Sequence, residues 1–271
     1  MIETTSNGQI KKIIKLSKSA SFRRKESTFI CEGWKMTGEA LARGLAKKLY
    51  IGEKNQENWR ERLMETNGTI GEEVAKNMVS TPVEIVSDKV FSQLSDTVTP
   101  QGVLALVEMP SYDREEILRD PEARLICLED IQDPGNLGTI MRTAEGAGMT
   151  ALVMTQNTVD LFNPKVVRAT MGGLFRLPFY VCQDMTTEVE SLKKAGFTSY
   201  AAHLKGRRDF KEEAYQGKTA ILIGNEAKGL QEATAKAADC LVKIPMEGQL
   251  ESLNAAVSAA LFMYEVHRKN H

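Results

Sequence analysis

The pattern that decides the fold lies between residues 125 and 149, which read LICLEDIQDPGNLGTIMRTAEGAGM. The apolar run at 125–128 predicts a buried strand, and apolar residues at helical spacing predict a helix over 137–146. Between them, residues 133–136 predict a sharp turn, because the proline lacks an amide donor and Gly135 tolerates positive φ. The stretch is therefore expected to be a strand, an elbow and a helix.

Two polar residues of this stretch are candidates for chemistry. Asn136 is expected at the elbow, and Arg142 within the first two turns of the helix. Elbows of this kind occur throughout α/β proteins, and an arginine on a helix can be an ordinary solvated residue. A catalytic reading therefore needs support from other segments.

Composition indicates a globular protein and excludes several classes. The chain has 271 residues, enough for two domains, with 42% hydrophobic and 26% charged residues. No apolar run approaches the roughly 20 residues of a membrane span, and the basic N-terminus lacks the apolar core of a secretory signal. The four cysteines are scattered without metal-ligand spacing, so we expect no metal site and a reducing, cytoplasmic location. Cys127 and Cys240 fall in apolar runs and are expected in the core.

Charge is unevenly distributed, although the net charge is only −1. Seven basic side chains and no acidic one lie between Gln9 and Lys25. Such a run attracts polyanions through counterion release, although a solvated helix face would also account for it. The run consists of Lys11, Lys12, Lys15, Lys18, Arg23, Arg24 and Lys25.

The chain divides into two α/β regions. Residues 1–108 predict a small domain, 109–123 a linker rich in proline and charge, and 124–271 a regular α/β alternation. In the first region we expect helices at 9–19, 34–43 and 90–94, and strands at 29–31, 48–51, 83–86 and 102–107. In the second we expect strands at 125–128, 151–154, 178–182, 198–202, 219–223 and 240–244. Its helices are expected at 137–146, 164–171, 187–195, 229–237 and 252–268.

Two further segments carry chemistry-bearing residues. Asn163–Pro178 reads NPKVVRATMGGLFRLP, and its Arg168 and Arg176 beside a glycine turn suit phosphate binding, although surface ion pairs would also explain them. Thr219–Leu230 reads TAILIGNEAKGL, where Gly224 permits a flat ligand against the backbone and Glu226 supplies a carboxylate. The glycines do not form the fingerprint of a dinucleotide-binding oxidoreductase, and no Walker loop occurs.

The last segment, Cys240–His267, reads CLVKIPMEGQLESLNAAVSAALFMYEVH. Its loop offers Ser252 and Asn254 as caps for the helix at 252–268, but a cap needs only one of them. The helix is apolar over a broader side than a surface helix needs. Core packing or a dimer seam would each account for that.

These segments, taken together, resemble the SpoU branch of the SPOUT family of RNA methyltransferases. Three ordered motifs carry the resemblance: DPGNLGTIMRTAEGAG, LIGNEAKGL and IPM…SLNAAVSAALFMYE. The segment NPKVVRATMGGLFRLP also matches, and the match covers residues 124–268. The N-terminal region is similar, more loosely, to the family's ribosomal-protein-like substrate-binding domain, through IKKIIKL, residues 29–33 (FICEG) and 100–105 (PQGVLA).

The resemblance implies a trefoil-knotted α/β domain, an exception to unknotted topology. It also implies S-adenosylmethionine as cofactor, bound at Gly224, Ile244 and Leu253, and a homodimer packed through the last helix. RNA is the implied partner, with the basic N-terminal residues and Arg168 as RNA contacts. No membrane and no metal are implied.

The implied reaction is methyl transfer to a ribose 2′-oxygen, in ribosomal RNA rather than transfer RNA. The family match makes Arg142 essential and proposes it as the base; the alternative from its chemistry is phosphate binding and stabilisation of alkoxide charge, because guanidinium stays protonated. The side chains implied to position the ribose and Arg142 are Asn136, Glu226, Ser252 and Asn254. Two alternatives remain: a methyltransferase of the same kind that acts on transfer RNA, and a catalytically silent RNA-binding homologue. The presence of the whole set of residues argues against the silent homologue.

Overall fold

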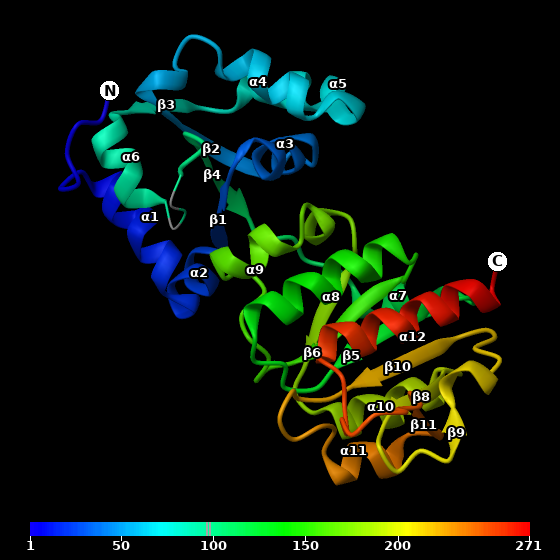
Figure 1. The fold of residues 1–271 in the computed structure, drawn as a ribbon. Coiled ribbons are helices and arrows are strands. Elements are labelled where there is room, and N and C mark those ends of the chain that lie inside the picture. Colours follow the sequence, from blue (N-terminus) through cyan, green and yellow to red (C-terminus); the bar gives the residue numbers. More distant parts are fainter. Residues whose placement is uncertain (96, 98) are drawn as a thin grey trace. The chain divides into compact units, whose positions relative to one another are not determined.

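The computed structural model describes residues 1–95, 97 and 99–271, which separate into two compact units (Figure 1). Unit 1 comprises Met1–Pro110 and Asp160–Phe175, and unit 2 comprises Ser111–Val159 and Arg176–His271. Both units are α/β, which confirms the predicted fold class. Among the residues described, no helix is long and apolar enough to cross a membrane.

Unit 1 is built on a four-stranded sheet in the order β1-β4-β2-β3. The strands are β1 (Thr28–Glu32), β2 (Ala46–Gly52), β3 (Val83–Val86) and β4 (Val103–Glu108). β4 pairs antiparallel with β1 and β2, and β3 pairs parallel with β2. The helices are α1 (Gly8–Lys18), α2 (Ala20–Glu26), α3 (Trp34–Ala42), α4 (Trp59–Thr66), α5 (Gly71–Ser80), α6 (Asp88–Leu94) and α9 (Pro164–Ala169).

Two features tie the elements of unit 1 together. The amphipathic α1 buries Ile10, Ile13 and Leu16, as its spacing predicted, and leaves lysines on the other face. The segment Asp160–Phe175 packs in this unit although the resemblance assigned it to the C-terminal domain. It does so through ring contacts with Phe29, whose centroid lies 4.9 Å from that of Phe162.

Unit 2 contains a parallel seven-stranded sheet in the order β7-β6-β5-β10-β8-β11-β9. Its strands are β5 (Arg124–Leu128), β6 (Ala151–Thr155), β7 (Phe179–Cys182), β8 (Thr198–Ala202), β9 (Arg208–Asp209), β10 (Thr219–Ile223) and β11 (Cys240–Lys243). Every residue of β6 and β10 is buried, as expected of a parallel sheet covered on both faces. The expected trefoil knot stays a prediction.

Helices cover both faces of this sheet: α10 and α11 lie on one side, and α8 and α12 lie side by side on the other (Figure 1). The helices of unit 2 are α7 (Arg114–Arg119), α8 (Pro134–Gly146), α10 (Met185–Lys194), α11 (Glu232–Ala237) and α12 (Ala255–Lys269). Of the expected linker, residues 114–119 form α7, whose Ile117 and Leu118 are buried in the core shared with α10.

The strands agree with the sequence prediction within two residues, except that β9 was not predicted. Helix α2 was also missed, because Ser19 ends α1 and at once caps the next helix, so the two read as one basic run. Helix α8 begins at Pro134 rather than 137, because Asp133 Oδ1 accepts the Asn136 N–H and proline is favoured in the first turn.

The turn before α8 also differs from the prediction. The left-handed residue is Asp130, with φ of 56°, whereas Gly135 is helical. Aspartate tolerates this conformation, and Thr155 Oγ1 holds it by accepting from Asp130 N at 2.9 Å and donating to Asp130 Oδ1 at 2.7 Å. The chain therefore turns earlier than predicted, and Asn136 lies in the first turn of α8.

Candidate active site

The residues predicted to be catalytic lie in unit 2, on helix α8 and in the loops after β10 and β11. Helix α8 itself follows the loop after β5. These loops follow β5, β10 and β11, and in a parallel sheet they emerge at the same, carboxyl-terminal edge. β10 pairs directly with β5, while β11 is separated from β10 by β8. The sheet order thus places the first two loops next to each other, at the edge where ligands bind in open α/β sheets.

Glu226 joins the first two loops. Its Oε1 accepts hydrogen bonds from Asn136 Nδ2 at 3.0 Å and from the Asp133 N–H at 3.1 Å. Its Oε2 accepts from the Gln132 N–H at 3.1 Å. Burial by itself raises the pKa of Glu226, but the Asn136 amide and the backbone N–H groups outweigh it, so the pKa lies below its ordinary value. The carboxylate is therefore ionised at neutral pH and holds the start of α8.

Asn254 joins the third loop to the same point. Its Nδ2 donates to Asn136 Oδ1 at 2.9 Å, while its Oδ1 accepts from the backbone of Ala256 at 2.8 Å. Asn254 is thus both the cap of α12 and a link to α8. Ser252 is exposed, and within the described chain it makes neither a cap nor another hydrogen bond. The structure therefore brings together Asn136, Glu226 and Asn254, and does not connect Ser252 to them.

Arg142 lies further along α8 and is exposed. Its guanidinium forms no hydrogen bond or ion pair with any residue that the structure describes. This contrasts with Arg176, also predicted for phosphate, whose Nε donates to Glu145 Oε1 at 2.8 Å. Arg142 is therefore a positive charge available to an external group, whereas Arg176 is held by an internal carboxylate.

The three residues expected to contact the cofactor, Gly224, Ile244 and Leu253, are all half-buried. Gly224 directly follows β10, Ile244 directly follows β11, and Leu253 precedes the cap of α12. The backbone N–H groups of Ile244 and Leu253 have no partner among the described residues, so they can donate to a ligand. Apolar side chains beside free N–H donors fit the adenine ring of S-adenosylmethionine.

Several residues that the sequence analysis did not single out support these loops. Asn225 Nδ2 donates to Asp130 O at 2.8 Å, and its Oδ1 accepts from the backbone of Ala227 at 3.0 Å. The buried Glu129 accepts from Gln231 N at 2.7 Å and from Thr234 Oγ1 at 2.5 Å. The only available signal was the run of polar residues between an apolar strand and the next helix.

The basic run of unit 1 is exposed except at Arg23, which is buried, and at Lys12, which is half-buried. Arg23 is only 2% exposed; its Nη1 donates to Leu16 O at 2.6 Å, and its guanidinium pairs with Asp160. Its assignment as an RNA contact is therefore wrong, because the group is buried and already paired. Lys12 pairs with Glu26 at 2.6 Å on the surface. The exposed residues of the run are Lys11, Lys15, Lys18, Arg24 and Lys25. Arg168 on α9 is half-buried.

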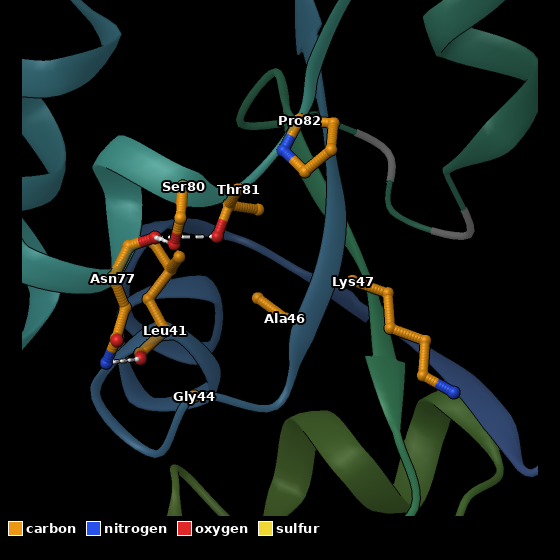
Figure 2. A pocket seen from close by; sticks show the side chains of 8 residues that line it. All are labelled: Leu41, Gly44, Ala46, Lys47, Asn77, Ser80, Thr81 and Pro82. Atoms are coloured by element: carbon orange, nitrogen blue, oxygen red, sulfur yellow. Dashed lines mark hydrogen bonds between the residues drawn. The ribbon is translucent and has the colours of Figure 1, made fainter.

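A hollow of about 190 Å³ lies in unit 1, lined by the ends of α3 and α5 (Figure 2). Its polar groups satisfy one another: Asn77 Nδ2 donates to Leu41 O at 2.8 Å, and Ser80 and Thr81 donate to Asn77 O. We assign it no function. In the described chain, no group of three or more His, Cys, Asp or Glu could hold a metal, and Cys127 is buried while Cys240 is half-buried.

Comparison with known proteins decides the family. Residues 123–264 match the SpoU rRNA Methylase family, and residues 7–105 match the MRM3-like substrate binding domain. The chain belongs to the SpoU rRNA methylase family. It is 31% identical over 268 residues to the 23S rRNA (guanosine(2553)-2'-O)-methyltransferase RlmP of Bacillus subtilis, covering 98% of each chain. This confirms the predicted family and an N-terminal substrate-binding domain.

Solved structures of the SpoU family share the fold. An AdoMet-bound rRNA methyltransferase from Sinorhizobium meliloti superimposes with a TM-score of 0.84 at 29% identity, over 98% of this chain and 97% of that one. The SpoU methyltransferase AviRb from Streptomyces viridochromogenes, in complex with AdoMet, gives 0.81 at 26% identity, over 97% and 99%. Both matches cover at least 97% of this chain and therefore include residues of both units.

Proposed function

We propose that this protein is an S-adenosylmethionine-dependent methyltransferase acting on a ribose 2′-oxygen of ribosomal RNA. Family membership supports the reaction class, and the relative from Bacillus subtilis acts on 23S rRNA at this oxygen. The observation that carries the proposal is the junction of Asn136, Glu226 and Asn254, together with the unpaired Arg142 on the same helix as Asn136. Free backbone donors at Ile244 and Leu253 support the choice of cofactor.

When bound, S-adenosylmethionine supplies a methyl group on a sulfonium, and the ribose hydroxyl must lose its proton as it attacks. Glu226 is poorly suited to accept that proton, because its pKa is lowered and its two oxygens already accept three N–H groups. As the 2′-hydroxyl proton passes to solvent water, Arg142 stabilises the negative charge that develops on the 2′-oxygen and binds the neighbouring phosphate. Asn136 and Asn254 fix the start of α8 and of α12, and Ser252 is left free to contact the ribose.

Methyl transfer to a defined RNA tests this function. Purified protein with radiolabelled S-adenosylmethionine should label an unmodified transcript of Bacillus subtilis 23S rRNA, and alkaline hydrolysis should leave a protected bond at one nucleotide. A tRNA pool serves as the matched substrate control. Labelling of tRNA alone would refute the ribosomal substrate, and labelling of a base rather than a ribose would refute the reaction.

The proposed homodimer rests on α12. Its inner side is buried, with Ala259, Phe262 and Val266 at 0% exposure, yet Val257, Leu261 and Tyr264 on the outer side are 48%, 39% and 51% exposed. Positions i, i+4 and i+7 lie on one stripe of a helix. An apolar stripe of this kind suits a two-fold contact with the same helix of a second copy.

Leu261→Glu should convert the dimer into a monomer, because two carboxylates would be buried against each other at the seam. Light scattering at micromolar concentration should give twice the 30.0 kDa chain mass for the wild type and a single chain mass for the variant. Val79→Glu is the control, since Val79 is 88% exposed and lies in unit 1. A monomeric wild type would rule out this interface.

Unit 1 supplies RNA affinity in this proposal. The exposed lysines of α1 contact phosphates, which set affinity and position without reading bases. Arg168 on α9 is a further RNA contact of the proposal. The proposal also includes a cytoplasmic location. The four free cysteines are consistent with a reducing compartment.

A further inference from the structure

A basic loop in unit 2 is not used by the proposed chemistry. It connects β8 to β9 and reads HLKGR over residues 203–207, followed by Arg208. Lys205 and Arg207 are exposed, and neither side chain makes a hydrogen bond or ion pair within the described residues. Leu204 beside them is 65% exposed. The loop thus carries two unpaired cations and, next to Lys205, an exposed apolar side chain.

The position of this loop follows from the sheet order. β8 lies between β10 and β11, and all three strands are parallel. The loop therefore begins at the carboxyl-terminal edge, between the strand end that carries Gly224 and the one that carries Ile244. Its cations are presented at the edge to which the cofactor residues belong.

The loop lies against β11. The His203 N–H donates to Val242 O at 2.9 Å, and Gly206 N donates to His203 O at 2.9 Å. A Cβ at Gly206 would lie 2.6 Å from the carbonyl carbon of Val242 and 2.9 Å from Lys243 N. The backbone of the loop therefore packs directly against the backbone of β11 at Gly206. The cations on either side of Gly206 are thus displayed from a backbone packed on β11, which reduces the ordering cost of binding a polyanion.

Acidic groups near the loop are already engaged. Glu232 is near enough for the charge of Lys205 to help lower its pKa, but its ion pair, at 2.7 Å, is with Lys236. Glu213 pairs with Arg208 at 3.2 Å. Neither carboxylate forms an ion pair with Lys205 or Arg207, so both cations are available to an external anion.

We propose that this loop is a second RNA-binding element, in which Lys205 and Arg207 contact backbone phosphates next to the target nucleotide and Leu204 packs on its ribose or base. The inference rests on the proposed function, because it takes RNA as the substrate. It assigns part of the RNA affinity to unit 2 itself, in addition to the lysines of unit 1.

The test is the double variant Lys205→Gln/Arg207→Gln, with Arg119→Gln/Lys194→Gln as control. The control also removes two exposed cations, but from helix ends that lead into β5 and β8 at the opposite, amino-terminal edge. Binding of the unmodified Bacillus subtilis 23S rRNA transcript is measured at several salt concentrations, and S-adenosylmethionine binding by calorimetry. A third variant, with Lys11, Lys12, Lys15 and Lys18 changed to Gln, gives the contribution of α1.

The loop variant should bind the transcript about tenfold more weakly, with a salt slope shallower by about 1.5 log units for two lost contacts. The control should match the wild type, and S-adenosylmethionine affinity should be unchanged in both. Equal losses in loop variant and control, or no loss in either, would overturn the proposal. Weaker S-adenosylmethionine binding in the loop variant would also overturn it, by assigning the loop to the cofactor pocket. Methyl transfer is scored separately, so a wild type that binds RNA without methylating it refutes the proposed function alone.

Discussion

Arg142→Ala should lower the rate of methyl transfer by about a thousandfold while S-adenosylmethionine binds with unchanged affinity. The side chain is exposed on α8 and engages no described residue, so its removal leaves no internal partner unsatisfied. The residues proposed for the cofactor lie in other loops, after β10 and β11. The loss should therefore appear in kcat at saturating cofactor, measured by radiolabel transfer, with calorimetry for cofactor affinity.

Arg142→Lys separates the two roles considered for this residue. Lysine keeps the positive charge but not the planar fork, so a residue that clamps a phosphate and stabilises alkoxide charge should retain only a small part of its activity. A residue acting as base should work better as lysine, whose pKa is lower, and its pH profile should shift toward neutrality. Thr139→Ala, at another exposed position of α8, is the control. Near-wild-type turnover in Arg142→Ala would remove this residue from the mechanism.

The strands and the motif loops could be predicted from the sequence because buried parallel strands are continuous apolar runs ended by glycine, proline or polar residues. The hydrogen-bond partners of the site residues could not be predicted from the sequence. Glu226 and Asn136 are 90 positions apart in the sequence. Their side chains meet only because β10 pairs with β5 in the sheet. Sequence indicates that both lie at a carboxyl-terminal edge, but the strand order that makes them neighbours is a property of the whole sheet.

Arg23 shows a second limit of prediction from the sequence, which concerns burial. In a run of basic residues, composition does not reveal which side chain points inward. The break at Ser19 starts a new helix and resets the periodicity that α1 had established, so the buried face of α2 could not be read by extending that of α1. The burial of Arg23 is compensated by carbonyls at the end of α1 and by Asp160, which lies 137 residues away.

Gly224→Ala should strongly weaken S-adenosylmethionine binding while leaving the fold intact. A Cβ at Gly224 would lie 2.1 Å from the carbonyl carbon of Gly229 and 2.1 Å from Leu230 N. These are backbone atoms of a loop closed by paired hydrogen bonds between Asn225 and Gly229, at 3.1 and 2.9 Å, so the loop must open. Opening it displaces the backbone beside the cofactor and moves Glu226 away from the start of α8.

We expect cofactor affinity to fall by about a hundredfold, because overpacking a close backbone contact costs on the order of 1–3 kcal/mol, and a tenfold change in affinity corresponds to about 1.4 kcal/mol. Methyl transfer should be lost with it, since Glu226 would no longer hold Asn136. Circular dichroism should still show a cooperative transition, because β10 remains a fully buried central strand. Gly8→Ala is the matched control, as its Cβ would meet nothing within 4 Å. Wild-type affinity in Gly224→Ala would show that this loop does not form the cofactor site; loss of the cooperative transition would instead assign Gly224 to folding.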